Sequence, residues 1–278
     1  MTKDPESALA AIPGTILLAG AGKMGGAMLT GWLNAGVALS RIAVIEPHLS
    51  DDVRKLAALD LRINPTTDEA GPLAALVLAV KPQSFGDAAP LLKTFTQPST
   101  LVVSIMAGMT IAKINAGCGG AVVRAMPNTP AAIGRGMTVA APASSVSSAQ
   151  RAFADALLRS TGKVEWVDDE ALMDAVTAVS GSGPAYIFLL AEELARAGIA
   201  AGLPAELATR IARETVSGAG ELLHQSDLDA AILRKNVTSP GGTTAAALDV
   251  LMGKDGLREL MTRAVAAATR RSKELAGG

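Results

Sequence analysis

Short runs rich in Val, Ile and Leu alternate with longer mixed segments as far as Val167, and this alternation limits the fold more than any other feature of the chain. Runs of that length, several of them bounded by Gly or Pro, predict buried strands of a mostly parallel sheet. We place them at Thr15–Ala19, Arg41–Ile45, Leu76–Val80, Leu101–Ile105, Ala121–Met126, Met137–Ala141 and Lys163–Val167. Gly25–Ala35 and Asp51–Ala58 fit crossover helices, so the sequence predicts a doubly wound α/β domain.

The pattern changes at Asp169, after which no short Val- and Ile-rich run occurs. Long helical patterns start instead near Glu170, Pro184, Pro204, Leu228, Thr243 and Leu257. We therefore predict two domains, a Rossmann-type domain with a doubly wound parallel sheet at residues 1–168 and an all-α domain at residues 169–278.

A glycine-rich segment, Gly20-Ala21-Gly22-Lys23-Met24-Gly25, lies between the first expected strand and the first expected helix. In that position its backbone N–H groups and the helix N-terminus suit the phosphates of a dinucleotide. About 20 residues further on, Glu46 follows the second strand, where a carboxylate bonds the ribose hydroxyls of NADH and repels the 2′-phosphate of NADPH. A tight turn and a solvated loop glutamate are the structural alternatives for the two features.

A second anion site is expected where Ser239-Pro240-Gly241-Gly242-Thr243-Thr244 opens an alanine-rich run. The adjacent glycines allow close approach to a ligand, and the helix start offers unpaired N–H groups and a partial positive charge to a carboxylate or phosphate. A chain with both features holds a dinucleotide in one place and a small anionic substrate in another, which suggests an oxidoreductase.

Two further segments end expected strands on the carboxyl side of the sheet, where ligands bind in doubly wound folds. Lys81, within Val80-Lys81-Pro82, either approaches the cofactor phosphates or extends to solvent. Met126-Pro127-Asn128-Thr129-Pro130 is a rigid loop that either faces the nicotinamide or is a structural turn.

Composition narrows the class of ligand. The net charge is −1 and only 3% of the residues are aromatic, so the chain offers neither a basic field nor stacking platforms for nucleic acid, and no field for an anionic membrane. No apolar stretch reaches the length of a membrane span, and the N-terminal segment lacks the features of a signal peptide. A single cysteine, Cys118, suits the cytoplasm, and we expect it to be a small buried residue rather than a nucleophile.

Strong proton donors are scarce. The histidines are His48 and His224, both in polar segments, and no lysine lies between Lys163 and Lys235, so the lysine acid of 3-hydroxy acid dehydrogenases is missing. No HxxH, CxxC or clustered carboxylate set indicates a metal. Reduction of a ketone leaves an alkoxide that needs a strong acid, whereas a cyclic imine arrives already protonated and accepts hydride directly. A hydroxyl such as that of Thr244 then suffices to orient or relay a proton.

Several segments together resemble pyrroline-5-carboxylate reductases, and the resemblance runs from about Thr15 to Leu275. They are Gly20–Gly25, Ala79–Pro82, Arg124–Pro130, Ser180–Tyr186 and Ser239–Thr244, of which the last two are the most specific. The resemblance implies reduction of 1-pyrroline-5-carboxylate to L-proline with NADPH or NADH, the closing step of proline biosynthesis. It also implies a helical domain that binds substrate and forms an interwoven homodimer, often assembled further into a decamer.

The resemblance, taken with the patterns above, assigns roles to single residues. Thr244 matches the catalytic threonine that hydrogen-bonds the ring nitrogen. The expected substrate-binding residues are Glu170, Asn236, Ser239, Gly241, Gly242, Thr243 and Thr244. The expected cofactor-binding residues are Gly20, Gly22, Lys23, Met24, Gly25, Glu46, Ala79, Val80, Lys81, Ile105, Met106, Ala107, Met126, Pro127 and Asn128.

Two positions depart from the resemblance. Many members of the family have Ser or Thr where this chain has Glu46, and we therefore expect a preference for NADH. Lys235 replaces an acidic residue common in the family.

Two other functions stay open: a related reductase of a ketol acid or 3-hydroxy acid, and a non-catalytic dinucleotide-binding dimer that senses redox state. The helix expected at Ala185–Ala201 is apolar on most of its sides, which favours interlocked subunits.

Overall fold

The structure is a computed structural model that describes residue 9 and residues 14–277 of the chain. The N-terminal segment in which we expect no signal peptide lies almost entirely outside the described residues. The chain divides into two compact units, Met1–Gly181 with Thr269–Gly278 (unit 1) and Ser182–Ala268 (unit 2). The sequence predicts a domain boundary between residues 168 and 169, where the last expected strand has ended. This boundary stays a prediction.

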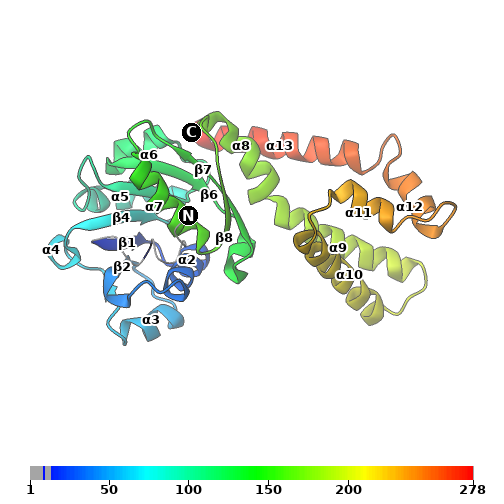
Figure 1. Cartoon of the computed structure of the whole chain (residues 1–278), viewed down its shortest axis with the longest axis horizontal. Helices are drawn as coiled ribbons and strands as arrows, with labels where there is room; N and C mark the ends of the chain where they lie inside the picture. Colours follow the sequence, from blue (N-terminus) through cyan, green and yellow to red (C-terminus); the bar gives the residue numbers. More distant parts are fainter. Residues whose placement is uncertain (1–8, 10–13, 278) are drawn as a thin grey trace. The chain divides into compact units, whose positions relative to one another are not determined.

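Unit 1 is built on one eight-stranded sheet with the order β3-β2-β1-β4-β5-β6-β7-β8 (Figure 1). The strands are β1 Thr15–Ala19, β2 Ile42–Ile45, β3 Arg62–Ile63, β4 Leu73–Leu78, β5 Leu101–Ser104, β6 Ala121–Met126, β7 Gly136–Pro142 and β8 Gly162–Trp166. Strands β1 to β6 run parallel, β7 pairs antiparallel with β6, and β8 runs parallel to β7. The strand order reverses between β1 and β4, which is where doubly wound folds bind ligands.

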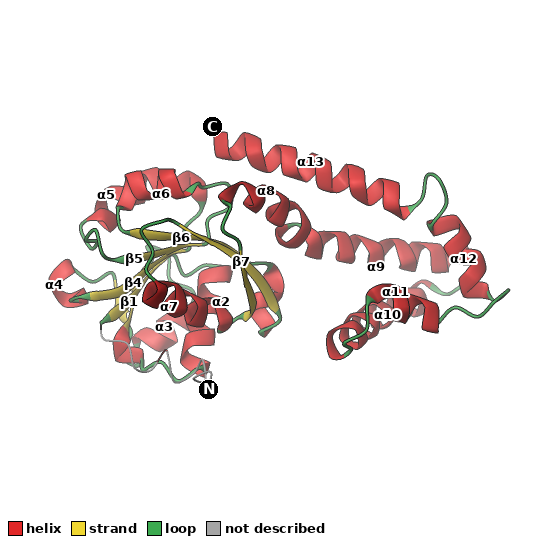
Figure 2. Ribbon diagram, turned by 45° about the horizontal axis from the view of Figure 1, so that its top comes forward, coloured by secondary structure: helices red, strands yellow, loops and turns green. Residues whose placement is uncertain are grey.

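Helices cover both faces of this sheet (Figure 2). Alternate residues of β1 enter different hydrophobic clusters, Ile16 with Trp32 on one face and Leu17 with Leu92 on the other. The helices on the first face are α2 Lys23–Asn34, α3 Asp51–Ala57 and α7 Ser148–Arg159, and those on the second are α5 Phe85–Lys93 and α6 Ile111–Cys118. Burial on both faces explains why the strands are continuous apolar runs rather than alternating ones.

Short elements connect this framework. They are the 3₁₀ turns η1 Leu39–Arg41, η2 Pro82–Ser84, η3 Thr129–Ile133 and η4 Glu170–Leu172, the helices α4 Thr67–Ala70 and α8 Met173–Val176, and the π-helical turn η5 Thr177–Gly181. The thiol of Cys118 lies inside the second cluster, where burial raises its pKa to about 11. The prediction of a small buried residue is confirmed, since Cys118 is 1% exposed.

Unit 2 is entirely helical. Its elements are α9 Gly183–Ala200, α10 Ala205–Gln225, α11 Ala230–Asn236, α12 Thr243–Leu251 and the start of α13 Leu257–Gly277, whose last turns belong to unit 1. Helices α9 and α10 pack closely where Gly198 meets Ala208, since a Cβ at Gly198 would lie 3.3 Å from that of Ala208. Within unit 2 only Ala208 and Ala212 are buried, so a single copy of this unit has almost no core.

The strands come largely where the apolar runs predict them, with differences at the ends. The expected strand Leu76–Val80 is wrong at both ends, because β4 is Leu73–Leu78 and Val80 lies in the loop beyond it. Ile105 and Val167 also follow their strands, yet their N–H groups still bond Leu78 and Ala140 of the neighbouring strands at 3.0 and 2.9 Å. The apolar runs therefore continue one or two residues beyond the regular strand pairing, which is why these strand ends were predicted too late in the chain.

None of the helices in the described part of the chain is both long enough and apolar enough to cross a membrane.

Candidate cofactor and substrate sites

The glycine segment turns tightly from β1 into α2. Gly20 has a positive φ of 93°, and a Cβ there would lie 2.6 Å from the carbonyl oxygen of Ala79. A Cβ at Gly25 would lie 2.1 Å from the carbonyl oxygen of Gly20. A Cβ at Gly22, in contrast, would meet nothing within 4 Å. Gly20 and Gly25 are therefore required by the packing of the turn, whereas Gly22 leaves open space in front of the backbone.

This open space lies at the N-terminus of α2. Gly22 is the N-cap residue of the helix, no side chain caps it, and the first turn contains no acidic residue. The free N–H groups and the helix dipole thus face the opening without a counter-charge from the first turn itself. The loop fits the pyrophosphate of a dinucleotide in charge and in space.

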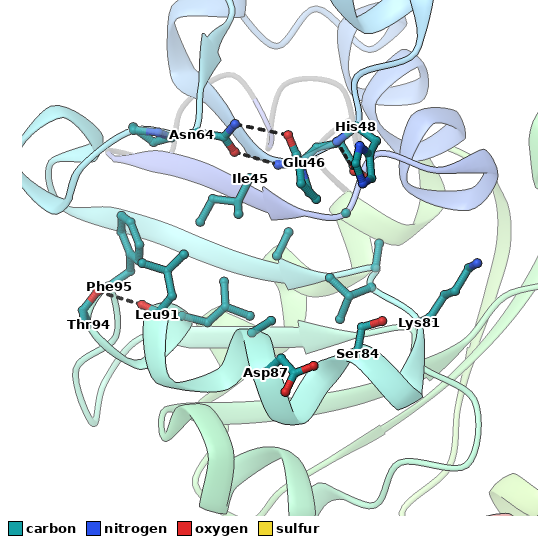
Figure 3. Close-up of a pocket in the computed structure, with 18 of the residues that line it drawn as sticks. Ile45, Glu46, His48, Asn64, Lys81, Ser84, Asp87, Leu91, Thr94 and Phe95 are labelled. Atoms are coloured by element: carbon teal, nitrogen blue, oxygen red, sulfur yellow. Dashed lines mark hydrogen bonds between the residues drawn. The ribbon is translucent and has the colours of Figure 1, made fainter.

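A cavity of about 1130 Å³ extends from this loop between the ends of β2, β3 and β4 and helix α5 (Figure 3). Its apolar wall includes Ile45, Val80 and Leu91, and its polar rim includes Glu46, Asn64 and Ser84. The volume and the apolar wall are suited to a nucleoside.

Glu46 lies at the edge of this cavity and is half-buried. One carboxylate oxygen accepts the N–H of Ala21 in the glycine turn at 2.9 Å, and the other accepts the N–H of His48 at 3.0 Å. The side chain of Glu46 is therefore held in one orientation, because both oxygens of the carboxylate are hydrogen-bonded to the main chain. The prediction that this group meets the ribose stays a prediction.

A second cavity of about 330 Å³ lies at the carboxyl ends of β4, β5 and β6. It brings together predicted cofactor-binding residues that are far apart in the sequence: Met24, Ala79, Val80, Lys81, Ile105, Met106, Ala107, Met126, Pro127 and Asn128. Ala79, Val80 and Lys81 also line the larger cavity, and Gly20, Gly22 and Glu46 line that cavity as well. The two cavities thus share one wall, as the two ends of a dinucleotide require.

Asn128 fixes the loop that forms one side of the smaller cavity. Its side-chain oxygen accepts the N–H of Met137 at 2.9 Å, and its amide nitrogen donates to the hydroxyl of Ser180 at 3.3 Å. Ser180 belongs to η5, and Gly181 at the end of this π-helical turn lines the cavity. Such π-helical turns are frequent at functional sites. Ser180 and Gly181 were not among the residues expected to bind the cofactor.

Glu170 lies in unit 1 and is bound to the sheet. Its Oε1 accepts from the guanidinium of Arg124 at 2.9 Å and from the N–H of Ile111 at 2.8 Å. Arg124 is 4% exposed, so this ion pair balances a buried charge on β6. The contacts give Glu170 a structural role, and its role toward substrate stays a prediction.

The other predicted substrate residues lie in unit 2, at the end of α11 and in the turn that leads into α12. Ser239 accepts the N–H of Gly242 with its carbonyl at 3.0 Å, and Gly241 has a φ of 70°. Pro240 and Gly241 thus occupy the central positions of a turn that suits proline followed by a left-handed glycine. Asn236 is the last residue of α11 and is exposed.

This turn presents an open helix start. Gly242 caps α12 without a side-chain hydrogen bond, and the first turn contains no acidic residue. Ser239, Gly241 and Thr243 are exposed and Thr244 is half-buried, so the turn that carries these N–H groups and hydroxyls is open to solvent. The geometry suits a small carboxylate.

Comparison with known proteins covers both halves of the chain. Residues 170–275 match the family described as "Pyrroline-5-carboxylate reductase dimerisation", and residues 15–108 match "NADP oxidoreductase coenzyme F420-dependent". The pyrroline-5-carboxylate reductase of Synechocystis sp. is 44% identical over 84% of this chain and 87% of the relative. That of Pseudomonas aeruginosa is 39% identical over 94% of this chain and 96% of the relative.

The chain belongs to the pyrroline-5-carboxylate reductase family. Solved structures of the family agree with this fold: the reductase of Coxiella burnetii superimposes with a TM-score of 0.86 at 34% identity, over 94% of this chain and 98% of that one. The Plasmodium falciparum pyrroline carboxylate reductase, solved with NADP bound, gives a TM-score of 0.79 at 30% identity over 95% and 99%. The present chain is thus an oxidoreductase with a Rossmann-type domain and a C-terminal helical region.

Sequence reasoning missed part of the reductase's larger cavity, notably Asn64, Thr66 and Asp87. Asn64 follows β3, a strand of two residues that is too short to give an apolar run. Its signal in the sequence was the pair Asn64-Pro65 after Ile63, a typical end to a strand. Among the described residues, no three His, Cys, Asp or Glu side chains gather in a way that could hold a metal ion.

Two alanine variants of the reductase separate the structural glycine from the one that faces the ligand. Gly22→Ala should leave the melting temperature within about 2 °C, since a Cβ there meets nothing, yet weaken NADH binding by about tenfold through obstruction of the loop. Gly25→Ala should destabilise the fold by about 2–4 kcal/mol because its Cβ strikes Gly20. Thermal unfolding and calorimetric titration measure both effects. Equal losses of stability in the two variants would contradict the distinction.

Proposed function

We propose that this chain reduces 1-pyrroline-5-carboxylate to L-proline with NADPH or NADH, the last step of proline biosynthesis. The observation that carries the proposal is the open turn Ser239–Thr244, which leads into a helix start suited to an anion and carries two hydroxyls. The other half of the chain has two adjoining cavities that together suit a dinucleotide. Membership of the family supports the same substrate.

The residues of unit 1 bind and orient the cofactor. The amides at the start of α2 receive its pyrophosphate, and the smaller cavity, with walls from Met106, Met126 and Pro127, receives the nicotinamide. NAD(P)H supplies the hydride when bound. The apolar side chains that line the smaller cavity limit the contact of the hydride donor with water.

The residues of unit 2 bind the substrate. The substrate carboxylate lies on the N–H groups of Thr243 and Thr244, while Gly241, where a Cβ would meet nothing within 4 Å, leaves room for its approach. The hydroxyl of Thr244 faces the ring nitrogen. The protonated imine needs no strong acid, because hydride adds to the imine carbon and the electron pair of the C=N bond moves to nitrogen. The new lone pair accepts a hydrogen bond from that hydroxyl, and the amine takes its further proton from solvent.

The reductase works as a homodimer or a larger assembly such as a decamer, in the cytoplasm. Large apolar side chains of α9 are exposed in the single chain, among them Ile187 at 50% and Phe188 at 68%. Such a face is rare on a monomer and typical of an obligate interface. The match of residues 170–275 to a dimerisation family supports the same reading.

The rate of NAD(P)H oxidation tests the proposed function. It is measured with pyrroline-5-carboxylate and compared with the rates for a panel of ketol acids and other keto acids. We expect turnover with the cyclic imine and at least about a hundredfold lower kcat/KM for every ketone, because the residues assigned to the substrate include no lysine or histidine that could protonate an alkoxide. Preferred reduction of a ketone would reject the proposal, and binding of dinucleotide without any turnover would favour a sensor.

Thr244→Ala separates chemistry from binding. The backbone amides remain, so KM should change little, while loss of the hydrogen bond to nitrogen should lower kcat by roughly ten- to a thousandfold. Thr243→Ala is the matched control, since it removes the adjacent hydroxyl and keeps the same turn. Gly242→Val should raise KM first, because its Cβ would lie 3.2 Å from the carbonyl oxygen of Ser239 and crowd the turn that receives the carboxylate. Steady-state kinetics that give an unchanged kcat for Thr244→Ala would remove this residue from the mechanism.

Glu46 should make the enzyme prefer NADH. Its carboxylate bonds the ribose hydroxyls and repels a 2′-phosphate, a contact that costs on the order of 1–2 kcal/mol, or about tenfold in affinity. Comparison of kcat/KM for the two cofactors measures this, and Glu46→Ser should shift the ratio toward NADPH. A preference for NADPH that persists in Glu46→Ser would contradict the assignment.

Dimerisation can be tested by sedimentation. Because unit 2 has so little core of its own, the chain at low micromolar concentration should show no species near 28.1 kDa. Phe188→Glu, at an exposed apolar position of α9, should favour smaller species and lower the melting temperature, whereas Leu59→Glu on unit 1 is the matched exposed control. An active, well-folded monomer would refute the assembly.

A further inference from the structure

Asn64 makes a pair of contacts that neither the predicted site nor the proposed mechanism uses. Its side-chain oxygen accepts the main-chain N–H of Glu46 at 2.9 Å, and its side-chain amide donates to the main-chain carbonyl of Glu46 at 3.2 Å. One side chain thus pairs with both polar main-chain groups of the residue expected to meet the ribose (Figure 3).

These contacts extend the sheet past its last strand residue. Val44 pairs with Ile63 in the parallel ladder of β2 and β3, and the N–H of Asn64 bonds the carbonyl of Val44 at 2.7 Å. Pro65 follows and has no N–H with which to continue the ladder. The chain leaves the sheet at Asn64, whose φ is 47°, and its side-chain amide takes the place of the missing main-chain partner.

The same pairing fixes the carboxylate. The main chain of Glu46 is held by Asn64. Its carboxylate oxygens accept the N–H groups of Ala21 and His48. Both oxygens therefore have a defined direction at the cavity edge, and turning the carboxylate away from a 2′-phosphate would break two charge-assisted hydrogen bonds. A fixed charge discriminates between ligands more strongly than one that can move aside.

We propose that Asn64 is a specificity-positioning residue: by holding the main chain of Glu46 it sets how strongly the site favours NADH over NADPH. It acts through Glu46 and has no part in hydride transfer. The proposal rests on the proposed function only for the identity of the cofactor.

The test is a double-mutant cycle read by calorimetric titration of NADH and NADPH, which needs no substrate and no turnover. Asn64→Gly removes the side-chain amide and relieves the left-handed backbone, so it isolates the contact with Glu46. Asp60→Gly is the matched control, because Asp60 is the other described non-glycine residue with positive φ, at 72°, and it has no contact with Glu46 among the described hydrogen bonds.

We expect Asn64→Gly to weaken NADH binding by about three- to tenfold and to lower the ratio of NADH to NADPH affinity by a similar factor. In a Glu46→Ser background, the same substitution should change that ratio by less than about twofold, because there is no carboxylate left to position. Asp60→Gly should leave the ratio within about twofold of the parent.

Three results would overturn the proposal. An unchanged ratio in Asn64→Gly would leave the residue a purely structural role, even if the melting temperature fell. An equal shift in the Glu46→Ser background would mean that Asn64 contacts the cofactor itself, and an equal shift in Asp60→Gly would assign the effect to loop strain. Failure to reduce pyrroline-5-carboxylate would instead reject the proposed function, while the affinity ratios would still decide the role of Asn64.

Discussion

The close approach of the glycine turn to the end of β4 is the contact on which the cofactor site depends. Gly20 lies against the carbonyl of Ala79, and Gly25 lies against the carbonyl of Gly20, so the N-terminus of α2 is held at the edge where the strand order reverses. Neither position has room for a side chain. The turn therefore presents backbone amides to the cavity, and Gly22 is the one glycine of the turn whose open face is available to a ligand.

The same solution, a helix start without a carboxylate in its first turn, occurs at α12 in unit 2. A chain with a net charge of −1 has no general field that attracts anions, so each anionic group must be recognised locally. Backbone amides do this without a buried lysine or arginine, whose desolvation is costly. Arg124, an arginine buried on β6, is instead paired with Glu170.

The sequence predicted those features that depend on neighbouring residues. Apolar runs located the strands, and the spacing from Gly25 to Glu46 located a carboxylate at the edge of the larger cavity, because both follow from the local order of βαβ units. β3 was missed because two residues cannot form an apolar run. α5 was missed because it contains Gly86 and Pro90, two residue types that usually interrupt a helix. Asn64 was missed together with β3. Its contact could not be predicted either, because its partner is the main chain of Glu46, 18 residues earlier, and the ladder of β2 and β3 brings the two together.

A crystal structure of the enzyme with oxidised cofactor and proline tests the central claim, that backbone amides at two helix starts hold the two anionic groups. The account predicts the pyrophosphate on the amides after Gly22 and the proline carboxylate on the N–H groups of Thr243 and Thr244, with the ring nitrogen at the hydroxyl of Thr244. A carboxylate bound by a lysine or arginine side chain, with the turn Ser239–Thr244 making no contact to proline, would contradict it.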